Sequence, residues 1–234
     1  MSQTARTQNA DQSGATAPTD AATVVPILAT PFGVVPLPAL AAKNAALADL
    51  FAARADAASL AAAHCYRSQD DLFLWPEPLA RQVAEEMARG VCSVVLAVNN
   101  LSEAELRGFS LEARGWFTVL EQDGHVPAAN YPMTAWCAVY CVAAPELSTT
   151  RIDSGVLRIY ESRLGAMFHD ATTAAMLSPY RPGHYGWRPV PGQMAVFPGS
   201  ATHEIALLRA AGNLILVTAR LRFLPAGQPS IGRW

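Results

Sequence analysis

Charged side chains are scarce in this chain. Only 15% of its 234 residues are Asp, Glu, Lys or Arg, and the formal net charge is -2. Domains that bind nucleic acid carry a clear excess of basic residues, so we expect no nucleic-acid partner. Half of the residues are hydrophobic (51%), yet no uninterrupted apolar run reaches the roughly 18–20 residues that a membrane helix needs. The composition therefore predicts one domain with a substantial core and no membrane partner.

Cysteine pairs at close spacing are also absent. The four cysteines include no CxxC motif, and Cys137 and Cys141 would lie about 13 Å apart on a strand, too far for a disulfide. We interpret all four as small buried hydrophobic residues in a reducing cytoplasm. Residues 1–23 lack the apolar stretch of a secretory signal and are polar, which predicts a disordered tail. We expect a cytoplasmic protein.

Helical signals are confined to the N-terminal half. Residues 24–38 are apolar but interrupted by prolines, which favours short strands at a sheet edge. Residues 39–56 are rich in Ala and Leu and predict a helix. A second helix is predicted at about 77–89, because proline suits the first turn and apolar residues recur every four positions after it. Gly90 leaves the C-terminal end of this helix uncertain.

From Trp116 onward, short apolar runs alternate with turns, without helices between them. This pattern favours an antiparallel sandwich or barrel, most plausibly a jelly roll, with its core over residues 116–223. The segment 165–191 is long, polar and rich in proline and glycine, as expected for a lid or the wall of a site. We predict a mainly β domain over residues 24–234, with the two helices packed outside it.

Five blocks of the sequence resemble the 2-oxoglutarate/Fe(II) oxygenases, a family rich in bacterial and phage proteins. They are ILATPFGVVPLP, GWFTVLEQDGH, NYPMTAWCAVYCVAAPE, LRIYESR and PVPGQMAVFPGSATHEI. Their order and spacing match the family over roughly residues 26–225. The resemblance implies a double-stranded β-helix, the cupin-like form of the jelly roll. It also implies Fe(II) and 2-oxoglutarate as cofactors and the activity of a dioxygenase.

Such a family member holds iron through two ligands that lie two residues apart on one strand and through a distal histidine. The resemblance places the distal ligand at His203 and the other two positions at Ala129 and Tyr131. An alanine offers no ligand, and tyrosine binds iron only as a phenolate. We predict that Ala129 and Tyr131 lie on the strand facing His203. We also predict a degenerate site without tight iron binding.

A relocated ligand set is the alternative. Asp123 and His125 are two residues apart and would complete a two-His, one-carboxylate set with His203. Asp123 and Gly124 are equally typical of a tight hairpin turn. With this set the protein would be an active iron oxygenase. A third possibility is another metal, such as copper, held by His125, His203 and a histidine of the long loop, His169 or His184.

The far carboxylate of 2-oxoglutarate needs a basic residue, usually an arginine. The resemblance places that anchor at Asn213 or Leu214, and neither is charged. Other candidates for the ligand pocket are distributed over the β region: Arg163, His184, Tyr140 and Arg209. Arg220 is seven residues from Asn213 and on a regular strand would face the other way. We predict a small-molecule or peptide ligand in the jelly-roll pocket.

Overall fold

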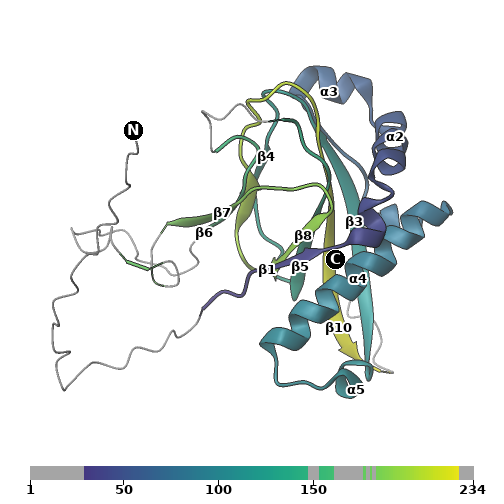
Figure 1. Cartoon of the computed structure of the whole chain (residues 1–234), viewed down its shortest axis with the longest axis vertical. Coiled ribbons are helices and arrows are strands. Elements are labelled where there is room, and N and C mark those ends of the chain that lie inside the picture. The colour runs from purple at the N-terminus through teal and green to yellow at the C-terminus, as the bar shows by residue number, and fades with distance from the viewer. Residues whose placement is uncertain (1–28, 147–152, 161–175, 178–179, 181–182, 227–234) are drawn as a thin grey trace, which may run out of the picture.

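Two antiparallel sheets form the body of the molecule (Figure 1). The computed structural model describes residues 29–146, 153–160, 176–177, 180 and 183–226. The larger sheet has the order β1-β8-β5-β10-β3-β2, with bounds Gly33–Pro36, Gln193–Pro198, Trp136–Ala143, Leu214–Pro225, Phe109–Leu120 and Cys65–Arg67. The smaller sheet has the order β4-β9-β6-β7, with bounds Val126–Ala129, His203–Ile205, Leu157–Tyr160 and His184–Trp187. This is the predicted jelly roll.

Helices cover the outer face of the larger sheet, as Figure 1 shows for α2 and α4. The helical elements are α1 Pro38–Ala41, α2 Asn44–Arg54, α3 Ala57–Ala63, η1 Leu72–Leu74, α4 Pro78–Val98 and α5 Glu103–Leu106. The expected helix over 39–56 is thus divided into α1 and α2. The second helix begins where predicted but continues to Val98. Gly90 lies within this helix and packs closely against Met194: a Cβ there would lie 2.5 Å from Cε of Met194, so the end of that flexible side chain would have to shift.

The proline-broken N-terminal stretch forms β1, an edge strand, as the sequence indicated. Its four residues pair with β8, from Gly33 opposite Val196 to Pro36 opposite Gln193. The strands β3 and β10 extend further than the predicted core, over twelve residues each. Their pairing runs without interruption from Leu214 opposite Leu120 to Pro225 opposite Phe109.

Side chains alternate between two separate cores along the central strands. In β10, Ile215, Val217 and Ala219 pack under the helices. Leu214 and Leu216 belong to the core between the two sheets. Because side chains on a strand alternate in direction, Thr218 and Arg220 share the inner face with Leu214. The inner face of β10 therefore changes from apolar to charged along its length.

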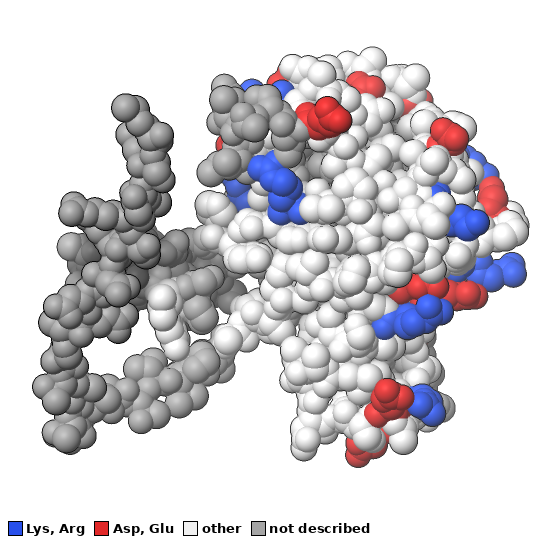
Figure 2. Space-filling model, viewed as in Figure 1, with Lys and Arg blue, Asp and Glu red and all other residues white. Residues whose placement is uncertain are grey.

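Figure 2 shows a face of the molecule on which most of the surface is uncharged. Lysine and arginine side chains lie close to aspartate and glutamate side chains on it, rather than gathered into a patch of one sign. Within the described part of the chain, none of the helices combines the length and the apolar character required to cross a bilayer.

Candidate functional site

His203 is the first residue of β9 and lies between two strands of the smaller sheet. Its partner in β4 is Ala129 and its partner in β6 is Ile159. Directly opposed residues of an antiparallel pair have their side chains on the same face, about 4.5–5.5 Å apart at Cβ. The structure thus places Ala129 beside His203, as the resemblance predicts. The side chain that faces His203 from β4 is therefore a methyl group.

The imidazole of His203 is buried, with 8% of the residue exposed. Its Nδ1 lies 2.9 Å from the carbonyl oxygen of Ala201. A carbonyl only accepts hydrogen bonds, so Nδ1 carries the proton and Nε2 has a free lone pair. Nε2 faces the Sγ atom of Cys137 at 4.0 Å. Burial lowers the pKa of His203, so the ring is neutral at neutral pH.

Tyr131 covers one edge of this imidazole. It lies beyond the end of β4, not on the strand as predicted, and its amide donates to the carbonyl oxygen of Gly199 at 2.7 Å. The Tyr131 ring centroid lies 5.5 Å from that of His203 and 5.7 Å from that of Trp116, both in edge-on geometry. Burial raises the pKa of the Tyr131 phenol, and it also raises the pKa of the Cys137 thiol. Both side chains are therefore neutral.

The donors around His203 do not fit a facial iron site. Among the residues that the structure describes, the side-chain donor groups in contact with His203 are one thiol and one phenol, and a carboxylate is not among them. Throughout the described ranges, no three or more His, Cys, Asp or Glu side chains lie close enough together to hold a metal ion. The structure therefore gives no support for Fe(II) held by Ala129, Tyr131 and His203.

The relocated ligand set is not assembled either. Asp123 and His125 are both exposed. Asp123 has a φ of 68° and donates its amide to the carbonyl of Leu208 at 2.7 Å. Its carboxylate lies 3.6 Å from a guanidinium nitrogen of Arg209. Asp123 thus belongs to a turn next to β9 and is paired with an arginine, while His203 is buried between the sheets.

The predicted anchor positions offer no positive charge. Asn213 is exposed and precedes β10, and Leu214 is a buried member of the core between the sheets. Arg209 is exposed and pairs with Asp123, so it is not directed at the core. The side chains of Asn213 and Arg209 are thus exposed, and their roles in a ligand pocket stay predictions.

The prediction that Tyr140 lines a pocket between the sheets is wrong, because this side chain lies on the other face of β5. Its ring belongs to the core beneath the helices, and its hydroxyl donates to Oδ1 of Asn44 in α2 at 2.7 Å. His184 is exposed on β7, with its ring 6.0 Å from that of Tyr160. Arg163 and His169 lie outside the described residues.

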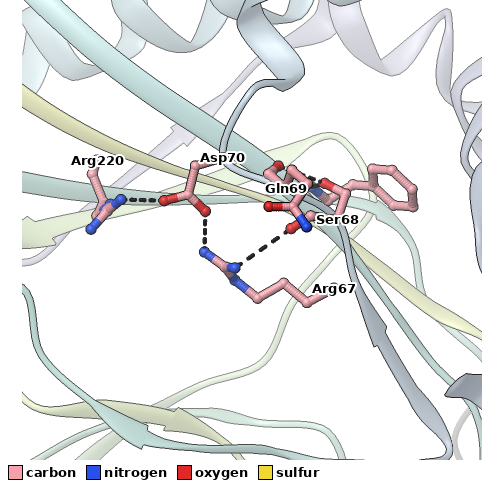
Figure 3. A network of polar contacts seen from close by, with 6 residues as sticks. Arg67, Ser68, Gln69, Asp70 and Arg220 are labelled. Atoms are coloured by element: carbon pink, nitrogen blue, oxygen red, sulfur yellow. Dashed lines mark hydrogen bonds and ion pairs between the residues drawn. The ribbon is translucent and has the colours of Figure 1, made fainter. Parts of the chain in front are cut away.

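Sequence reasoning missed a cluster of charged side chains around Arg220, on the inner face of β10. Figure 3 shows Arg220 and Arg67 on either side of Asp70. The side chains of Arg220, Asp70 and Arg67 are 14%, 30% and 44% exposed. Asp70 follows β2, so the cluster joins the first strands of the chain to the last. We refer to these three residues as the Arg–Asp–Arg cluster.

Aromatic rings connect this cluster to His203. The guanidinium carbon of Arg67 lies 4.2 Å from the ring centroid of Trp116. That of Arg220 lies 5.4 Å from Trp116 and 5.0 Å from Tyr131. Cations over aromatic faces are attracted by the ring quadrupole, which holds both arginines in place. The missed signal was the position of Arg220 six residues after Leu214, an even separation that places both on one face.

Comparisons with known proteins identify this architecture. No protein-family model matches the chain, and no curated protein matches it significantly. Among solved structures, the non-haem α-ketoglutarate-dependent epimerase SnoN from nogalamycin biosynthesis has a TM-score of 0.53 at 12% identity, covering 86% of each chain. HygX from Streptomyces hygroscopicus, with nickel and 2-oxoglutarate bound, has a TM-score of 0.51 at 11% identity, covering 85% of this chain and 84% of HygX.

A prolyl-4-hydroxylase from Pseudomonas putida is also similar. Its TM-score is 0.50 at 15% identity, with 82% of this chain and 91% of the hydroxylase covered. The identities are low in all three structures, so the likeness is one of fold. It agrees with the order of the sequence blocks and with the two sheets described above. The chain has the jelly-roll fold of the 2-oxoglutarate/Fe(II) oxygenases.

Proposed function

We propose that this protein binds a small molecule or peptide between the two sheets of its jelly roll, without an iron site of the usual kind. The observation that carries the proposal is the register pair of Ala129 and His203. Metal ligands in this fold come from facing strands, and here one of the facing side chains is a methyl group. Such a protein retains the fold of an oxygenase and functions through binding.

The chemistry of the remaining groups supports this proposal. Iron binding would have to ionise the Tyr131 phenol or the Cys137 thiol, and burial raises the pKa of both. One imidazole with water and a cosubstrate leaves iron exchangeable, because the loss of even a supporting group weakens metal affinity about 10–100-fold. The uncharged Leu214 at the anchor position further weakens the case for 2-oxoglutarate.

A metal titration tests the proposal. Purified protein is titrated with Fe(II) and 2-oxoglutarate under anaerobic conditions, and bound iron is measured after desalting. We expect no stoichiometric iron in the natural protein. We expect the double variant A129H/Y131D to gain iron binding that depends on His203, because these changes supply the two missing ligands beside the retained one.

Tight iron binding by the natural protein is the result that would contradict the proposal. Stoichiometric iron in the natural protein that is lost in His125→Ala and His203→Ala, with release of succinate from 2-oxoglutarate, would contradict the proposal. It would establish the relocated ligand set instead. The variant His64→Gln is a matched control, because this histidine is exposed and belongs to none of the candidate ligand sets.

A further inference from the structure

We propose that Arg67 and Arg220 form a binding site for a ligand carboxylate, and that the Asp70 side chain occupies this site when no ligand is bound. The inference rests on the proposed function in one respect, because it assigns the chemical class of the ligand that binds between the sheets. The site differs from the anchor position of the resemblance. Arg220 lies six residues further along β10 than Leu214, which corresponds to about 20 Å on a strand.

The first argument is the geometry of Asp70. Its two carboxylate oxygens are divided between two arginines, with Oδ1 on Nη2 of Arg67 and Oδ2 on Nη2 of Arg220 (Figure 3). Charge-assisted hydrogen bonds between guanidinium and carboxylate are about twice as strong as neutral ones. Asp70 therefore marks where a planar, two-oxygen anion fits between the two guanidinium groups.

The second argument is charge and access. In the cluster, two arginines are paired with the same carboxylate, that of Asp70. Asp70 and Arg67 are 30% and 44% exposed, so solvent reaches both side chains. The pair of Arg67 with Asp70, whose side chains are both partly exposed, contributes only about 0–1 kcal/mol. A ligand that brings its own carboxylate and further contacts can therefore displace Asp70.

The third argument is the chemical character of the surroundings. Tyr131 contacts both Arg220 and His203, so it links the cluster to the groups around the imidazole. The pKa of His203 is lowered and that of Tyr131 is raised, so both are neutral. A second charge on the ligand would find no partner among these neutral groups. The ligand class that fits is a monocarboxylate whose remainder is uncharged.

The test uses benzoate as the probe, in buffer containing EDTA, with binding followed by calorimetry and by NMR shifts of the tryptophan indole protons. Asp70→Asn removes the competing carboxylate while retaining the shape of the side chain. We expect this variant to bind benzoate at least about tenfold more tightly than the natural protein, which is 1.4 kcal/mol. Adding Arg220→Gln to that variant should abolish the gain.

Glu112→Gln is the matched control. Glu112 pairs with Arg222, two residues after Arg220, and the arginines are similarly buried, with side chains 10% and 14% exposed. If the gain came only from removing a negative charge, this control would show it too, and the proposal would be overturned. Should Asp70→Asn fail to fold, Arg220→Gln alone must still weaken benzoate binding by the natural protein.

Two further outcomes are decisive. Inorganic phosphate that binds Asp70→Asn as tightly as benzoate would refute the carboxylate class. Benzoate affinities that are equal in the natural protein and in Asp70→Asn would refute the displacement of Asp70. Repeating the titration with Fe(II) separates this inference from the proposed function, because binding at the two arginines is expected to be independent of iron.

Discussion

His203 is buried in surroundings that keep it neutral. Its Nδ1–H donates to the carbonyl oxygen of Ala201, and its Nε2 faces the thiol of Cys137. The rings of Tyr131 and Phe197 shield it on two sides, with centroids at 5.5 and 4.9 Å. The protonation of this buried imidazole is therefore coupled to the stability of the folded protein.

That link predicts how stability depends on pH. Burial lowers the pKa of His203, so below the ordinary value of about 6.5 the unfolded chain takes up a proton that the folded protein does not. The stabilisation from keeping this histidine neutral is present above about pH 6.5 and is lost as the pH falls through the folded-state pKa. Urea unfolding of the natural protein should show the free energy of unfolding decreasing from about pH 7.5 to 5.5.

The variant His203→Gln isolates this contribution, because glutamine does not titrate. We expect a smaller decrease over the same pH range than in the natural protein. An exposed histidine is the comparison, and His125→Gln should keep the part of the pH dependence that His203 contributes. An equal decrease in the natural protein and in His203→Gln would show that another group is responsible.

At the scale of elements, β5 separates the two cores. Cys137, Val139 and Cys141 face the other sheet, whereas Ala138 and Tyr140 face the helices. Tyr140 is fully buried and yet has a hydrogen-bond partner, because Asn44 in α2 accepts its hydroxyl proton at 2.7 Å. Burial raises the pKa of Tyr140 to about 12, which keeps it a donor at all ordinary pH values.

We predict that this hydrogen bond docks α2 on the larger sheet. Tyr140→Phe should lower the free energy of unfolding by about 1 kcal/mol, the typical net value of such a bond. The measurement is a double-mutant cycle with Asn44→Ala in urea unfolding. Benzoate binding should be unchanged, because Tyr140 lies on the far side of the sheet. Effects of the two variants that simply add would rule out the coupling.

On the scale of the whole molecule, the core between the helices and the larger sheet differs in composition from the core between the two sheets. The first contains the stacked rings of Phe51 and Phe117, with centroids 4.5 Å apart. The second contains His203 in contact with Phe197, and it is the layer in which the proposed ligand binds. The N-terminal helices therefore stabilise the sheet from the side opposite the site.

This arrangement predicts that stability and binding are separable. Phe51→Ala should lower the free energy of unfolding by about 3–5 kcal/mol, because it leaves a cavity in a fully buried region. At temperatures where the variant remains folded, its affinity for benzoate should equal that of the natural protein. Leu74→Ala, at a side chain 75% exposed, is the control and should have little effect on stability. Weaker binding in folded Phe51→Ala would contradict this separation.

The sequence by itself determined the fold class and the approximate bounds of its main elements. Helical spacing placed α4, alternation after Trp116 indicated the sheets, and prolines marked β1 as an edge strand. The spacing of Ala129 from Trp116 and Pro132 matched the family pattern and predicted that this residue faces His203, with which it is paired. These features depend on residues that are near one another in the sequence or on a known order of blocks. Periodicity and spacing are therefore enough to predict them.

Only the tertiary structure decided which side chains meet. Asp70 and Arg220 are 150 residues apart in sequence, and no local pattern indicates that they pair. The direction of the Arg220 side chain was predicted by counting residues from the assumed anchor position. Counting from Asn213 turns Arg220 away from the space between the sheets, whereas counting from Leu214 turns it inward. Tyr140 was misplaced for the same physical reason. On a strand, a shift of one residue in the assumed register moves every side chain to the opposite face.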